Sequence, residues 1–102
     1  CTTIRRFTMK IKYTDKIKKQ ISKSLLQEII QLSFSIIPYQ SLHIFSFEHI
    51  KMNEICITHI APLANIEKKI YLNQCEIPIE NIILLRNNDT IYLFTESEYA
   101  TL

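Results

Sequence analysis

Two histidines, His43 and His59, come closest to a chemical site by residue type and spacing. Each lies in a segment where apolar and polar residues alternate, and "HIKMN" between the segments suits a hairpin connection. With the hairpin centred near Met52, residue i lies opposite about residue 102 − i, so that His43 faces His59 across two strands. Two imidazoles so placed are the beginning of a metal site, which a cysteine or a carboxylate would complete.

The same two residues have a simpler interpretation, as half-exposed strand histidines at the rim of the core. The sequence identifies no third ligand, and a slip of one residue in the register would put the rings on opposite faces. We therefore predict no metal and no cofactor, and name His43 and His59 as the candidate ligands that a metal would use.

The N-terminal quarter of the chain is strongly basic. Residues 1–23 carry a local charge of +7 and residues 24–102 one of −5, within a net charge of +2. Such asymmetry marks a face for nucleic acid or an acidic partner, or else an ordinary solvated surface. Phe7 and Tyr13 fall on the apolar side of the predicted first strand, which leaves few rings to stack on bases. The predicted partner-binding residues are Arg5, Arg6, Lys12, Lys16, Lys19 and Lys23.

Two functions follow from this basic segment. The first is a non-enzymatic interaction module that binds another protein, which suits a compact domain with a sheet rich in edges. The alternative is an accessory protein that binds nucleic acid directly through Arg5 to Lys23. No recognition motif of the usual nucleic-acid-binding classes is present, so the protein partner is preferred.

The absence of glycine excludes several classes of enzyme. The chain has no glycine among 102 residues, so it lacks the Walker phosphate loop, the dinucleotide-binding fingerprint and the G-x-S-x-G nucleophile elbow. Glu96 and Glu98, with Glu80, form a candidate carboxylate pair, but acids on a terminal tail without a pocket usually face solvent. We predict that the protein is not an enzyme.

Cysteine usage and hydropathy favour a reducing compartment. Cys1, Cys56 and Cys75 are too widely spaced for a disulfide framework or a four-ligand zinc site. The longest apolar runs, such as Ile82–Leu85, are too short to span a bilayer. No charged-then-apolar leader is visible, and removal of a methionine before Cys1 explains the first residue most simply. We expect a cytoplasmic protein without membrane contact.

One strand and one long helix are predicted at the start of the chain. Thr14 and Asp15 have the side chains of a helix start. Apolar residues then recur at helical spacing up to about Phe34, and Pro38 ends the pattern, so we predict one amphipathic helix over about Asp15–Phe34. The apolar stripe consists of Ile17, Ile21, Leu25, Leu26, Ile29, Ile30 and Leu32. The alternating apolar residues of the preceding half-buried strand are Phe7, Met9, Ile11 and Tyr13.

The rest of the chain alternates with period two and predicts strands. The order β-α-β-β-β-β-β corresponds to a single α+β domain over residues 1–102, with one helix packed on a mainly antiparallel sheet. In the last hairpin "RNND" stands where glycine is usual, and we expect its asparagines to tolerate the left-handed backbone region. The five predicted strands are Ser41–Phe47, Glu54–Ile60, Lys68–Leu72, Asn81–Leu85 and Ile91–Phe94.

The order of short motifs resembles a family of bacterial proteins, domain-of-unknown-function family 960. "RRFT" at Arg5–Thr8, "YQSLHIFSF" at Tyr39–Phe47 and "ICITHIAPLANIEKKIYL" at Ile55–Leu72 are similar to the family's opening, its central strand and its Ile-x-His strand. The closing hairpin from Pro78 to Glu96-Ser97-Glu98-Tyr99 is also similar. The turn departs from the family pattern, which is usually acidic with a glycine.

The resemblance implies a cellular setting more than an activity. The family occurs in low-GC Gram-positive bacteria and their mobile genetic elements, and it brings no established activity to transfer. A mobile-element setting implies a modulator or inhibitor of a DNA-processing or host-defence protein as the function of the interaction module. A DNA mimic is not implied, because such proteins are strongly acidic and this chain is slightly basic.

Overall fold

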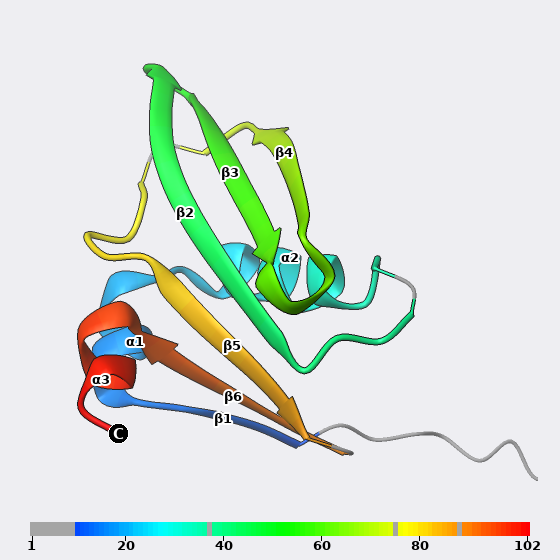
Figure 1. The fold of residues 1–102 in the computed structure, drawn as a ribbon. Helices are drawn as coiled ribbons and strands as arrows, with labels where there is room; N and C mark the ends of the chain where they lie inside the picture. The colour runs from blue at the N-terminus through cyan, green and yellow to red at the C-terminus, as the bar shows by residue number, and fades with distance from the viewer. Residues whose placement is uncertain (1–9, 37, 75, 88) are drawn as a thin grey trace, which may run out of the picture.

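In the part of the chain that the structure describes, six strands form one sheet in the order β1-β6-β5-β2-β3-β4 (Figure 1). A computed structural model describes residues 10–36, 38–74, 76–87 and 89–102. Neighbouring strands are antiparallel except for β1 and β6, which are parallel. The predicted α+β class with a mainly antiparallel sheet is confirmed. The strands are β1 Lys10–Tyr13, β2 Leu42–Lys51, β3 Glu54–Ala61, β4 Ile66–Leu72, β5 Ile82–Asn87 and β6 Thr90–Thr95.

The single long helix of the prediction is wrong, because the segment forms two helices, α1 Asp15–Gln20 and α2 Lys23–Ser33. The backbone is extended at Ile21 and Ser22, and the Ser22 hydroxyl accepts the N–H of Leu25 at 3.2 Å. Serine favours such caps over helix interiors because its side chain replaces a missing backbone acceptor. A 3₁₀ turn, η1 Pro62–Ala64, and a C-terminal helix, α3 Glu96–Ala100, complete the fold.

The cap at Ser22 makes a local prediction. Ser22→Ala is expected to lower the free energy of unfolding by about 1 kcal/mol, because the first turn of α2 loses its side-chain acceptor. Gln31→Ala, at an exposed position of the same helix, is expected to change it by less than about 0.5 kcal/mol. Urea denaturation measures both values, and equal values would mean that the hydroxyl contributes nothing as a cap.

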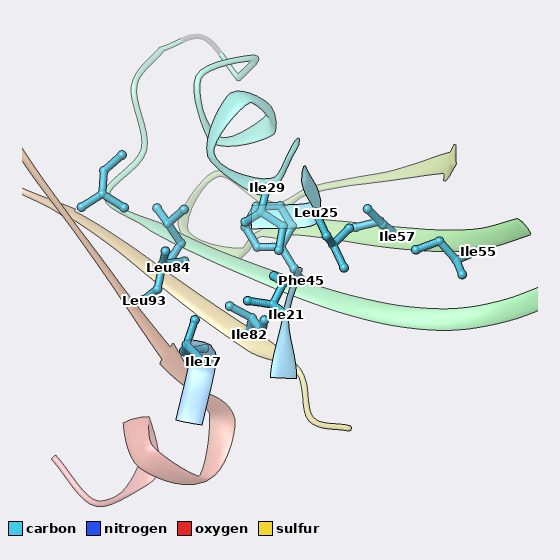
Figure 2. Packing of buried hydrophobic residues seen from close by; sticks show 11 residues of the cluster. Ile17, Ile21, Leu25, Ile29, Phe45, Ile55, Ile57, Ile82, Leu84 and Leu93 are labelled. Carbon is cyan, nitrogen blue, oxygen red and sulfur yellow. The ribbon is translucent and has the colours of Figure 1, made fainter. Parts of the chain in front are cut away.

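The predicted apolar stripe does form the core. Ile17, Leu25 and Ile29 of the two helices are at most 1% exposed and pack on one face of the sheet (Figure 2). Leu26, Ile30 and Leu32 are partly buried against the same cluster. The strand residues of this cluster are Phe45, Ile55, Ile57, Ile82, Leu84, Ile91 and Leu93.

The first strand departs from its predicted burial. Ile11 and Tyr13 point to the helix-covered face, yet they are 42% and 45% exposed, because β1 is an edge strand that α2 does not cover. Figure 1 shows α2 behind β2 and β3, away from β1. The predicted half-buried strand is therefore an exposed edge, while Phe7 and Met9 lie outside the described residues.

The second face of the sheet carries no helix over its centre. In Figure 1 no helix crosses in front of β5, β2 and β3. The strand registers place a group of half-buried apolar side chains on this open face, together with Lys10 and Lys12 of β1. The apolar members of the group are Leu42, Ile44, Ile60, Leu85, Tyr92 and Phe94.

A residue with left-handed backbone conformation occurs at a turn where the sequence did not predict one. Among the described residues only Asn65 has a positive φ, 55°, where it ends η1. Asparagine tolerates this region because its short polar side chain bonds locally. The expected left-handed conformation at "RNND" is absent from Asn87 and Asp89, and Asn88 lies outside the described residues.

Candidate functional site

The histidine pair forms, although by a different register from the predicted one. Phe45 lies opposite His59 and Phe47 opposite Ile57, so that residue i pairs with 104 − i. A shift of two residues leaves every side chain on its predicted face. His43 therefore remains a diagonal neighbour of His59, and His43 Nδ1 lies 2.8 Å from His59 Nε2. Both side chains are fully buried, which corrects the prediction of half-exposed histidines.

The proton positions in the pair follow from one backbone carbonyl. His43 Nε2 lies 3.0 Å from the Gln40 carbonyl oxygen, which only accepts, so Nε2 carries the proton. In neutral His43 the Nδ1 atom then accepts a hydrogen bond from His59 Nε2–H. This leaves His59 Nδ1 as a buried acceptor without a hydrogen-bond partner among the described residues.

The surroundings keep both rings neutral. Burial lowers the pKa of His59 to about 4, with smaller effects from His43 and Lys68. Burial also lowers the pKa of His43, against the hydrogen bond to Gln40, which raises it. The Phe45 ring stacks on His59 with centroids 4.5 Å apart. The two neutral rings therefore link β2 and β3 through one buried hydrogen bond.

The pair is not arranged around a metal. The two facing nitrogens share one hydrogen bond, so neither presents a lone pair to a common ion. Cys56 lies on the opposite sheet face, since it alternates with Ile55 and Ile57. Within residues 10–36, 38–74, 76–87 and 89–102 no group of three or more histidine, cysteine or acidic side chains could hold a metal ion.

The predicted partner-binding residues that the structure describes make separate contacts rather than one patch. Lys16 Nζ lies 3.2 Å from Glu80 Oε2 and donates to Ser97 Oγ. Lys12 lies on the open face, with Nζ 5.9 Å from the centroid of the Tyr92 ring. Lys19 is exposed on α1, and Lys23 begins α2. Arg5 and Arg6 lie outside the described residues.

An apolar groove of about 580 Å³ lies between β1 and the two N-terminal helices. We call it the β1 groove. Among the described residues, its charged lining residues are Lys18 and Lys23, and none of the lining side chains is acidic. The remaining lining residues are Ile11, Tyr13, Ile17, Ile21, Leu26, Gln27 and Ile30. The groove thus combines an apolar floor with positive charge, at the sheet edge where β1 has no outer neighbour among the described residues.

The C-terminal acids are structural. Glu98 accepts the backbone N–H of Thr95 at 3.0 Å and the hydroxyl of Thr14 at 2.8 Å, and Thr95 caps α3 in return. The Thr95 hydrogen bond is the main cause that lowers the pKa of Glu98. Glu80 accepts the N–H of Ser97 at 3.0 Å, and hydrogen bonds from Ser97 lower its pKa to about 2. Glu80 and Glu98 therefore cap the start of α3, whereas Glu96 is exposed, as expected of an acid in the C-terminal tail, and accepts a hydrogen bond from Asn81 Nδ2 at 3.1 Å.

One cluster has no signal in the sequence. The Arg86 guanidinium carbon lies 4.4 Å from the ring centroid of Phe34 and 4.2 Å from that of Tyr39. The Tyr39 hydroxyl donates to the Arg86 carbonyl at 2.7 Å, which fixes the ring. Because Arg86 lies far along the chain from Phe34 and Tyr39, no local sequence motif identifies the cluster. The contacts tie the segment after α2 to the end of β5.

Comparisons with known proteins bear on the fold. Within the described residues, no helix has the length and apolar character needed to cross a membrane. No family model and no curated protein sequence matches the chain. A crystal structure of a protein of unknown function from Enterococcus faecalis has the same fold, with a TM-score of 0.76 and 12% sequence identity. The match covers 94% of this chain and 97% of the Enterococcus chain, so nearly the full length of both chains shares the fold.

Proposed function

We propose that this protein is a non-enzymatic interaction module that binds an acidic, partly apolar segment of another protein in the β1 groove. The observation that carries the proposal is the composition of the groove: six apolar or aromatic lining residues, two lysines and no acid. Charge complementarity then selects a partner segment with carboxylates beside apolar side chains.

The geometry suits an extended partner segment. β1 ends the sheet, so its outer backbone groups have no strand beside them within the described residues. An added strand would gain backbone hydrogen bonds there, and every second side chain would enter the groove. Ile11 and Tyr13 would then contact apolar side chains of the partner, while Lys18 and Lys23 would pair with its carboxylates.

The resemblance to domain-of-unknown-function family 960 suggests the partner class. In a mobile genetic element, a small binding module would act as a modulator or inhibitor of a DNA-processing or host-defence protein. Such a partner would carry the acidic segment, and the module would modulate or inhibit the partner by binding that segment.

A defined peptide tests the groove. A ten-residue peptide that alternates valine and glutamate is expected to shift the amide NMR signals of Ile11, Tyr13 and Leu26, whereas a valine–lysine peptide is not. The double variant Lys18→Glu/Lys23→Glu is expected to weaken binding of the acidic peptide by about tenfold or more, because two attractions become repulsions. Lys51→Glu/Lys69→Glu, away from the groove, is the matched control.

Two outcomes would contradict the proposal. One is equal binding of both peptides. The other is signal changes spread evenly over the sheet with no loss in the groove variant. If the acidic peptide does bind in the groove, pull-down from a native lysate identifies the natural partner. The groove variant is expected to lose this partner, the control variant is expected to keep it, and nuclease treatment is expected to leave the binding unchanged.

A further inference from the structure

Two aromatic rings lie side by side on the open face of the sheet. Tyr92 and Phe94 are two residues apart on β6, and their ring centroids are 6.5 Å apart with planes only 11° from parallel. Both are half-buried, and the covered side of β6 is occupied instead by Ile91 and Leu93. The two nearly parallel rings thus lie one strand in from the β1 edge of the sheet, at the end of the strand order opposite β4.

Positive charge lies directly beside these rings. The parallel register pairs Lys10 with Thr90 and Lys12 with Tyr92, which puts both lysines on the same face as the rings. The Lys12 ammonium lies 5.9 Å from the centroid of the Tyr92 ring. Lys12 makes no ion pair with any residue that the structure describes, where Lys16 with Glu80 is the single salt bridge.

A shallow hollow accompanies the rings. It has a volume of about 160 Å³ and is lined by Lys12, Tyr92 and Phe94, with Tyr13, Thr14 and Leu93. None of the described residues that line it is acidic. Acids occur beyond its two ends, at Asp89 in the β5–β6 turn and at Glu96 in α3.

We propose that this surface, Lys10, Lys12, Tyr92 and Phe94, binds single-stranded nucleic acid. Tyr92 and Phe94 would each stack with one base, and Lys10 and Lys12 would contact the phosphates between them. Stacking on exposed rings of a sheet beside a basic strand is how proteins bind unpaired bases of any sequence. A duplex would bind this surface more weakly, because its bases already stack on one another and are not free to stack on the rings.

The four residues of this surface do not line the β1 groove, although Tyr13 lines both the groove and the hollow beside the rings. Along β1, Ile11 and Tyr13 face the groove, whereas Lys10 and Lys12 face the open side. A protein segment and a nucleic-acid strand would therefore occupy opposite faces of the same edge strand. Variants of one face leave the side chains of the other in place.

The test is fluorescence anisotropy with a labelled twelve-residue oligothymidylate at low salt. Tyr92→Leu and Phe94→Leu, which keep apolar bulk, are each expected to weaken binding about tenfold or more through lost stacking. Lys12→Gln is expected to weaken binding and to reduce the slope of log affinity against log salt by about 0.7, one phosphate contact on a single strand. Tyr71→Leu and Lys69→Gln are the matched controls, on the same sheet face but at the β4 edge, and are expected to bind like the wild type.

An abasic oligonucleotide of equal length separates stacking from simple charge attraction. We expect it to bind at least about tenfold more weakly than oligothymidylate, and we expect the duplex to bind no better than the abasic strand. Equal binding of abasic and normal strands, equal losses in the Tyr71 and Lys69 variants, or no saturable binding would each overturn the proposal. Circular dichroism of every variant checks that its fold is kept.

Discussion

Leu25→Ala and Ile29→Ala are each expected to lower the free energy of unfolding by about 2–5 kcal/mol. Leu25 is 1% exposed and Ile29 is fully buried, and both side chains of α2 pack against Phe45 and its neighbours on the sheet. Truncation removes apolar burial and leaves a cavity, because the strands beneath cannot collapse into it. Losses of this size are a large part of the total stability of a domain of 102 residues.

Lys19→Ala on the exposed surface of α1 is the control. It is expected to change stability by less than about 0.5 kcal/mol. Urea denaturation followed by circular dichroism gives all three values under one set of conditions. A larger loss for Lys19→Ala than for the two core variants would mean that the helices present a different face to the sheet.

Acidification from pH 7 to pH 5 is expected to lower the free energy of unfolding by about 2 kcal/mol through His59 alone. In the unfolded chain this histidine titrates near its ordinary pKa of 6.5, whereas burial lowers the folded value to about 4. The unfolded state therefore binds more protons below pH 6.5, so stability is full above that pH and is lost as the pH falls toward 4. His43 acts in the same direction, since its pKa is also lowered.

The third histidine supplies a matched control for this pH effect. His49 lies exposed on β2, and His49→Gln is expected to keep the wild-type loss between pH 7 and pH 5. His59→Gln is expected to remove most of it, whatever its stability at pH 7, because the comparison uses the change with pH. The carboxylates with lowered pKa values, Glu80 and Glu98, affect stability only below about pH 4.5. A wild-type loss that survives in His59→Gln would contradict the buried neutral pair.

Local patterns were enough to predict most of the elements. The alternation of apolar and polar residues identified the strands, and helical spacing identified the face of α1 and α2 that enters the core. The helix break was missed although its signal was present, since Ser22 stands between Ile21 and Lys23 as a cap. A continuous stripe does not reveal such a break, because apolar residues keep their spacing across a short extended link.

The histidine pair shows what period-two patterning determines and what it leaves open. The alternation of side chains between the two faces is enough to put His43 and His59 on one face, and a register error of two residues does not change that face. Their distance, their full burial and the carbonyl of Gln40 that sets their protons depend on the exact register and on the helices above. The pair was thus predictable, but its chemistry was not.

Sequence by itself determined the α+β class, the core-facing residues and the exclusion of glycine-dependent nucleotide sites, because these depend on local periodicity and composition. Only the tertiary structure decided that β1 is an uncovered edge, since strand order is a long-range property. The tertiary structure also places the lysines of the basic segment at three different sites. Lys18 and Lys23 line the β1 groove, Lys16 pairs with Glu80, and Lys12 lies beside the Tyr92 ring. The rings beside Lys12 come from β6, eighty residues later in the chain, and pairing across that distance leaves no trace in local spacing.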